Sequence, residues 1–137
     1  MALEYIEKAL HICFSENHPP GRSYLNSGAI YSVMGKFFLA FENTKNAIIS
    51  LRRELGSCEY KQKRELSRMI ILAYYNVSVL EENLEMFRQS LVSLENALVL
   101  SESIFGIEDG MTLELAKELE KRTVILKRKK LKQMVHQ

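Results

Sequence analysis

The stretch that decides the fold is SYLNSGAIYSVMGKFFLAFENTKNAIISL, residues 23–51, because the chain uses its pattern more than once. A second copy, AYYNVSVLEENLEMFRQSLVSLENALVL, occupies residues 73–100, and ALEYIEKALHI, residues 2–12, repeats only the back half. Internal repeats tens of residues long are typical of stacked helical hairpins. The sequence therefore predicts an all-α fold, an α-solenoid of antiparallel helical hairpins with a long C-terminal helix.

The spacing of apolar residues predicts six helices and no strands. We expect the helices at about residues 2–15, 21–34, 37–55, 59–83 and 86–105, and from Asp109 or Thr112 to about residue 134. Gly35 suits a tight turn because glycine tolerates positive φ, Gly56 suits the end of the third helix, and Gly106 marks the break after the fifth. The charged start of the fourth helix, EYKQKRELSR, should protrude into solvent.

The helices group into units. We expect a partial unit at 2–20, full units at 21–56 and 59–106, and a capping helix with a basic tail at 109–137. Connections of two or three residues inside each full unit force the two helices to be antiparallel neighbours. The partial unit has no first helix, so we expect either that the sequence is part of a longer repeat protein or that another chain completes the unit.

Five positions of the second unit carry a resemblance to a known family. They are a small and an aromatic residue in the first helix, a turn glycine, and two alanines in the second helix: Gly28, Tyr31, Gly35, Ala40 and Ala47. The pattern resembles the tetratricopeptide repeat, in the longer variant known from kinesin light chains. Ser78, Glu81, Glu85, Ser90 and Ala97 take these places in the third unit, and Ala2 and Ala9 are the alanine pair of the first.

The resemblance implies that the first helices of the units line a concave groove that binds an extended peptide. Asn26 and Asn76 both stand two residues before the small residue, and an amide there can pair with any peptide group because it both donates and accepts. The implied groove residues are Arg22, Leu25, Asn26, Ala29, Ser32 and Val33, followed by Leu72, Tyr75, Asn76, Val79 and Asn83.

No residue pattern indicates catalysis, a cofactor or a metal. His11 and Cys13 are two residues apart and so point to different faces of a helix, and no second Cys/His pair follows them. The sequence has no glycine-rich phosphate loop and no HExxH motif, and Glu81 and Glu82 are adjacent and cannot share a helix face. We therefore expect a protein that is not an enzyme.

Cysteine content and hydropathy indicate the cellular compartment in which the protein is expected. Two cysteines in 137 residues are too few for a disulfide framework, which favours a reducing compartment. No apolar run approaches the roughly 20 residues of a membrane-spanning helix. The expected location is cytoplasmic, with a cytoskeletal or ciliary setting as one possibility.

The positive charge gathers at the C-terminal end. Residues 111–137 hold eight Lys or Arg and three Glu, whereas the formal net charge of the whole chain is only +2. The cations of this tail are Lys121, Arg122, Lys127, Arg128, Lys129, Lys130 and Lys132. They suit the C-terminal end of a helix dipole and the polar outer face of a last helix. They also suit an acidic partner such as tubulin; nucleic acid is disfavoured because no aromatic residues are interleaved for base stacking.

These features predict a non-enzymatic scaffold or adaptor that works by protein–protein interaction. The first hypothesis is a structural component of a larger assembly, such as a ciliary or other cytoskeletal lattice. The second is a peptide-binding adaptor that uses the concave groove. The third is nucleic-acid or lipid binding through the basic tail, which would weaken steeply as salt is raised.

Overall fold

The computed structural model describes residues 20–135, and all regular structure in that part of the chain is helical. The helices are α2 (Gly21–Val33), α3 (Phe37–Ser57), α4 (Tyr60–Asn83), α5 (Phe87–Phe105) and α6 (Gly110–Val135). The predicted all-α class and absence of strands are confirmed for these residues. The helix predicted at 2–15 lies outside the described residues.

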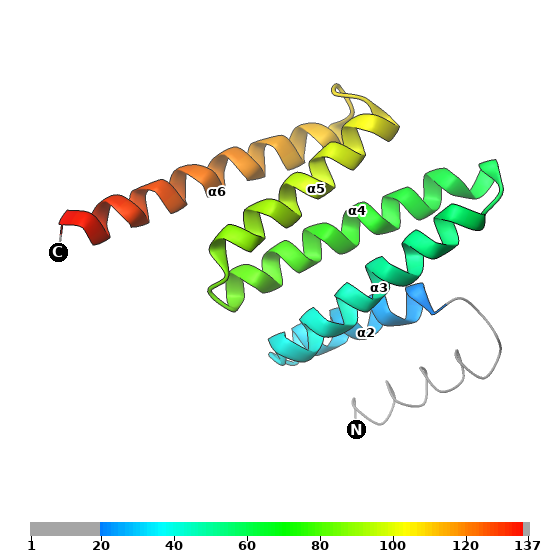
Figure 1. The fold of residues 1–137 in the computed structure, drawn as a ribbon, viewed down its shortest axis with the longest axis horizontal. Coiled ribbons are helices and arrows are strands. Elements are labelled where there is room, and N and C mark those ends of the chain that lie inside the picture. The colour runs from blue at the N-terminus through cyan, green and yellow to red at the C-terminus, as the bar shows by residue number, and fades with distance from the viewer. Residues whose placement is uncertain (1–19, 136–137) are drawn as a thin grey trace.

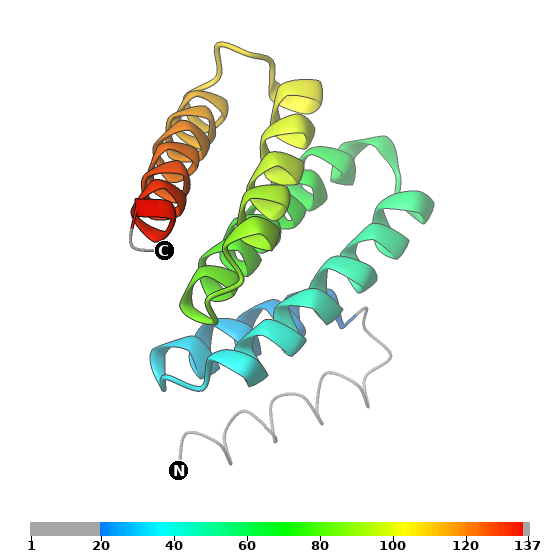
Figure 2. The ribbon, with the colours of Figure 1, turned by 60° about the vertical axis from the view of Figure 1, so that its left-hand side comes forward.

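Consecutive helices run in opposite directions and lie in chain order, from α2 at one end to α6 at the other (Figures 1 and 2). The helices pack against their neighbours in the chain, and the packing is most extensive within the pairs α2/α3 and α4/α5. Three small apolar clusters fill the contacts, two shared by α2, α3 and α4 and one shared by α4, α5 and α6. None of the described helices is long and apolar enough to span a bilayer.

The core is built on the small residues that the repeat pattern singled out. Ala40, Ala47 and Ala97 are completely buried. Gly28 lies against α3 so closely that a Cβ there would collide with the Thr44 hydroxyl and press on the backbone of Ala40. The absence of a side chain at Gly28 therefore sets how closely α2 and α3 approach.

The pairs α2/α3 and α4/α5 match at an offset of 50 residues. Helix α3 begins at Phe37 and helix α5 at Phe87. In the first turn the Lys36 amide donates to the Tyr31 carbonyl at 2.9 Å, and in the second the Met86 amide donates to the Glu81 carbonyl at 2.7 Å. The two turns therefore have the same hydrogen-bonded geometry although their sequences differ.

The turn residue itself shows that difference. Gly35 has φ +75° and Glu85, at the same place in the second turn, has φ +62°. An L-residue with a side chain is disfavoured in this left-handed conformation, whereas glycine adopts it freely. The turn between α4 and α5 thus keeps the geometry of the turn between α2 and α3, although Glu85 must adopt an unfavourable backbone conformation.

Replacing Glu85 with glycine should stabilise the protein. Relief of the left-handed conformation outweighs the added freedom of the unfolded chain, so we expect the free energy of unfolding to rise by about 0.5–1 kcal/mol in urea denaturation. Gly35→Ala, the matched change in the other turn, should lower it by about 1 kcal/mol. A destabilised Glu85→Gly variant would contradict this account of the turn.

Glu81 occupies the position that Tyr31 holds in the first pair, and it is buried. Burial raises the pKa of the Glu81 carboxyl, and a hydrogen bond from the Ser93 hydroxyl and the nearby Lys45 charge oppose that rise. Because the folded-state pKa is raised, the stability that Glu81 contributes is fully present below the ordinary carboxyl pKa. That contribution is lost as the pH increases through the raised value.

Two predictions about helix ends differ in outcome. Asp109 stands immediately before α6 and caps it, because its carboxylate accepts a hydrogen bond from the Met111 amide at 3.0 Å. Thr112 is buried instead, 2.6 Å from the hydroxyl of Ser101, and joins α6 to α5. Gly56 does not end α3: the helix continues to Ser57 and stops where the backbone becomes extended at the next residue.

The start of α4 protrudes as expected. The side chains from Tyr60 to Glu65 are exposed, and burial begins at Leu66. Helix α4 thus begins with an exposed, charged segment that contacts its neighbours at the surface, through Glu65 with Arg22 of α2 and Arg64 over the ring of Phe105 of α5. The apolar part of α4 lies between its neighbours.

Candidate binding groove

Helices α2, α4 and α6 present two adjoining pockets. The first, of about 410 Å³, lies between α2 and α4, with one lining residue, Thr44, from α3: Gly28, Ala29, Ser32, Thr44, Tyr75, Asn76, Val79 and Leu80. The second, of about 550 Å³, lies between α4 and α6: Ile71, Leu72, Tyr75, Met111, Glu114, Leu115, Lys117, Glu118 and Lys121. Both volumes lie in the range of ligand-binding pockets. Because Tyr75 lines both, the two pockets form one surface, which we call the groove.

The two halves of the groove differ in chemistry. Small side chains and one amide, Asn76, dominate the half between α2 and α4, so an extended backbone could approach closely and exchange hydrogen bonds there. The half between α4 and α6 has an apolar floor that includes Ile71 and Leu115, with Lys117 and Lys121 on its α6 wall. The groove can therefore form hydrogen bonds with a peptide backbone between α2 and α4 and bind an apolar side chain between α4 and α6.

The structure brings together six of the predicted groove residues. Ala29, Tyr75, Asn76 and Val79 all line the pocket between α2 and α4. Ser32 lines the same pocket and Leu72 lines the adjoining one.

The other predicted groove residues lie elsewhere. Leu25 is buried in the core with Ala47 and Leu51, because it is on the side of α2 that faces α3. Arg22 is exposed and pairs with Glu65 of α4 at 2.8 Å. Asn26, Val33 and Asn83 are exposed but do not line either pocket.

The α6 wall was not predicted from the sequence. Met111, Leu115 and Lys117 lie beyond the repeated pattern, and nothing in the repeat indicates that the last helix continues the groove. The only signal was the spacing of Met111 and Leu115, four residues apart on one face of a helix.

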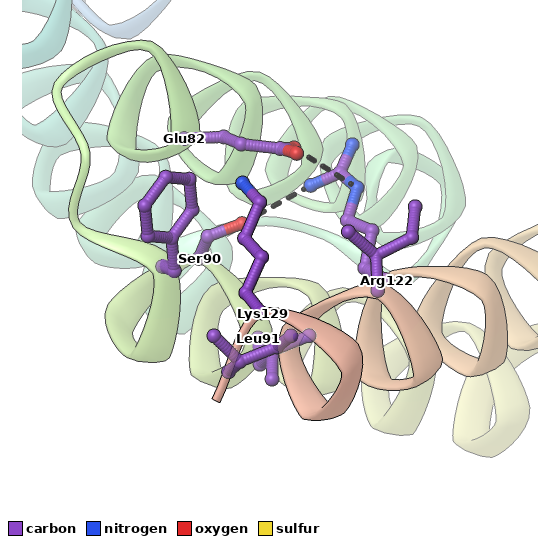
Figure 3. Close-up of a pocket in the computed structure, with 8 residues that line it drawn as sticks. Glu82, Ser90, Leu91, Arg122 and Lys129 are labelled. Atoms are coloured by element: carbon purple, nitrogen blue, oxygen red, sulfur yellow. Dashed lines mark hydrogen bonds and ion pairs between the residues drawn. The ribbon is translucent and has the colours of Figure 1, made fainter. Parts of the chain in front are cut away.

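Arg122 holds this wall in place. It is only 8% exposed, and its guanidinium donates to Glu118 at 2.8 Å and lies 3.3 Å from the carboxylate of Glu82. The same side chain donates to the hydroxyls of Ser78 at 3.0 Å and Ser90 at 3.2 Å. Figure 3 shows Arg122 reaching from α6 between Glu82 of α4 and Ser90 of α5.

The two serines explain why an arginine fits here. Ser78 and Ser90 stand at the places of Gly28 and Ala40 in the first helix pair, so the residues remain small but gain hydroxyl acceptors. Tyr75 adds its ring face at 5.7 Å from the guanidinium carbon. Since Tyr75 and Glu118 line the groove and contact Arg122, the buried cation fixes two groove residues directly.

Arg122 therefore does not belong with the exposed cations of the predicted tail. Lys121 lines the groove, and Lys129 is exposed but lies over the ring of Phe87 at 4.0 Å. Lys127, Arg128, Lys130 and Lys132 are exposed on the last turns of α6. The surface available to an acidic partner is thus smaller than the sequence indicates.

Comparison of the chain with family models, with curated proteins and with solved structures gives no match in any of the three.

Proposed function

We propose that this chain is a non-enzymatic protein-interaction module, a solenoid of tetratricopeptide-like hairpins that binds a segment of a partner protein along the groove. The observation that carries the proposal is that two pockets meet at Tyr75 and extend across three helices. The matching turns of α2/α3 and α4/α5 support the repeat assignment. As a scaffold or adaptor, such a module would serve a larger cytoplasmic assembly, for which a cytoskeletal or ciliary lattice is one setting.

The proposal makes Tyr75 and Asn76 the residues on which binding depends. Peptides selected from a displayed library on the full chain should bind it measurably by calorimetry. Tyr75→Ala should weaken their binding at least about tenfold, as expected for a central aromatic contact. Asn76→Ala should weaken it about two- to tenfold through lost backbone hydrogen bonds.

Asn96 supplies a matched control, since it is an exposed asparagine on α5, away from both pockets. Asn96→Ala should leave the affinity unchanged. The unaltered helical content of each variant by circular dichroism shows that the effect is local. Selected peptides that bind equally well to wild type, Tyr75→Ala and Asn76→Ala would refute binding in the groove.

The tail supports a second candidate, an acidic protein surface such as tubulin. Four exposed cations at the end of α6, Lys127, Arg128, Lys130 and Lys132, favour it. Their attraction would be electrostatic, so co-sedimentation with microtubules should weaken as salt is raised and when these four residues are neutralised. Equal pelleting of wild type and the neutralised variant would remove this candidate.

A further inference from the structure

The outer faces of α3 and α5 carry matching stripes of exposed side chains. Both stripes follow alternating spacings of four and three residues, which places them along one face of each helix. On α3 the stripe is Phe38, Glu42, Lys45, Ile49 and Arg52, and on α5 it is Arg88, Val92, Glu95, Val99 and Glu102, all exposed. Members of the two stripes correspond at the same offset of 50 residues that relates the two helix pairs.

The two stripes are opposite in charge at two corresponding positions. Lys45 corresponds to Glu95, and Arg52 corresponds to Glu102. Between these charged positions, each stripe has one half-exposed β-branched residue, Ile49 at 51% and Val99 at 57%. The face of α3 therefore has an apolar residue between two cations, and the face of α5 has an apolar residue between two anions at the corresponding positions.

The charged groups are available for contacts outside the chain. Lys45 lies over the ring of Phe41 at 4.9 Å, with the Glu81 carboxyl nearby, and Arg52 lies over the ring of Tyr74 at 5.3 Å. Within the described part of the chain neither cation forms an ion pair, so both keep their charge near the face. Among residues 20–135, no ion pair involves Glu95 or Glu102.

We propose that this outer face binds a second copy of the chain in a two-fold dimer. The two-fold axis runs along the helices, so that α3 of one protomer lies parallel to α5 of its partner, and α5 to α3. Residues at the same height then meet: Lys45 with the partner's Glu95, Ile49 with the partner's Val99, and Arg52 with the partner's Glu102. An isologous dimer makes this set of contacts twice.

The charge pattern also excludes the competing pairings of the same helices. Pairing α3 with its own copy would place Lys45 and Arg52 beside identical cations, and pairing α5 with its copy would juxtapose glutamates. Opposite charges beside a small apolar seam are the means by which parallel helices select their partners. Because exposed ion pairs are individually weak, we expect a reversible, concentration-dependent dimer that weakens with salt. The dimer leaves the groove free and does not depend on groove binding.

Charge reversal tests the dimer directly. We define an acidic variant, Lys45→Glu with Arg52→Glu, and a basic variant, Glu95→Lys with Glu102→Lys. Each variant alone places like charges against like, so its dissociation constant for self-association should rise at least about tenfold in sedimentation equilibrium between about 10 µM and 1 mM. An equimolar mixture of the two variants should recover the wild-type dissociation constant within about threefold, as a heterodimer.

Two more proteins complete the test. The fourfold variant that combines all these changes reverses both stripes and should dimerise with itself as wild type does. Lys61→Glu with Lys63→Glu changes the net charge as the acidic variant does, but on the protruding start of α4, and should dimerise normally. A wild-type chain that stays monomeric to 1 mM, variants that dimerise like wild type, or a mixture no more associated than its components would each overturn the proposal.

Discussion

Arg122→Ala should lower the free energy of unfolding by about 2–3 kcal/mol, because it removes the cation from a buried polar cluster and leaves its partners unpaired. The side chains of Glu82 and Glu118 are 39% and 31% exposed, so water screens part of the loss and the expected value lies at the low end for a buried pair. The hydroxyls of Ser78 and Ser90 would also lose their charged donor.

Lys130→Ala is the matched control for this prediction. It removes the same charge from the same helix at an exposed position and should change stability by no more than about 0.5 kcal/mol. Urea denaturation compares the two variants, and hydrogen exchange should show loss of protection in α6 for Arg122→Ala. Equal stability of the two variants would mean that Arg122 does not hold α6 against α4 and α5.

Gly28→Ala should destabilise the protein by about 1–3 kcal/mol, since the added methyl group would collide with Thr44 and press on the backbone of α3. Thr44 cannot simply rotate away, because its hydroxyl donates to the Ala40 carbonyl at 2.7 Å. In a Thr44→Ala background the same change should cost less than half as much, and a double-mutant cycle in urea measures the difference.

Gly56→Ala tests whether the cost at Gly28 comes from crowding rather than from changing a helical glycine. Gly56 also lies inside a helix, but a Cβ there would have open space around it. That variant should be stabilised by up to about 1 kcal/mol, through helix propensity. If Gly28→Ala were also stabilising, the close approach of α2 and α3 would not depend on glycine.

The helices could be predicted from the sequence because their apolar residues recur at helical spacing and their ends carry local signals. Gly35 acts within a few residues of itself, so its position and role were both evident, whereas Asp109 was one of two candidates for the start of the last helix. Glu85 shows the limit of that reasoning. The second turn adopts the left-handed conformation with a residue that disfavours it, because the packing of α4 against α5 decides the turn.

Only the groove residues that lie within the repeated sequence pattern could be predicted. Tyr75, Asn76 and Val79 were found because the pattern places them on the first helix of a unit. The α6 wall and the buried position of Arg122 depend on tertiary contacts between residues more than thirty positions apart, such as Arg122 with Ser78. Charge alone placed Arg122 with its exposed neighbours, and only the contacts with α4 and α5 distinguish it from them.

Mapping amide chemical-shift changes on the ¹⁵N-labelled full chain tests the central claim most directly. A selected peptide is titrated at one fixed protein concentration, so that self-association stays constant. Binding in the groove predicts shift changes that centre on Tyr75 and Asn76 and extend to the facing sides of α2 and α6. Changes concentrated on the outer faces of α3 and α5, with Tyr75 and Asn76 unaffected, would contradict the account.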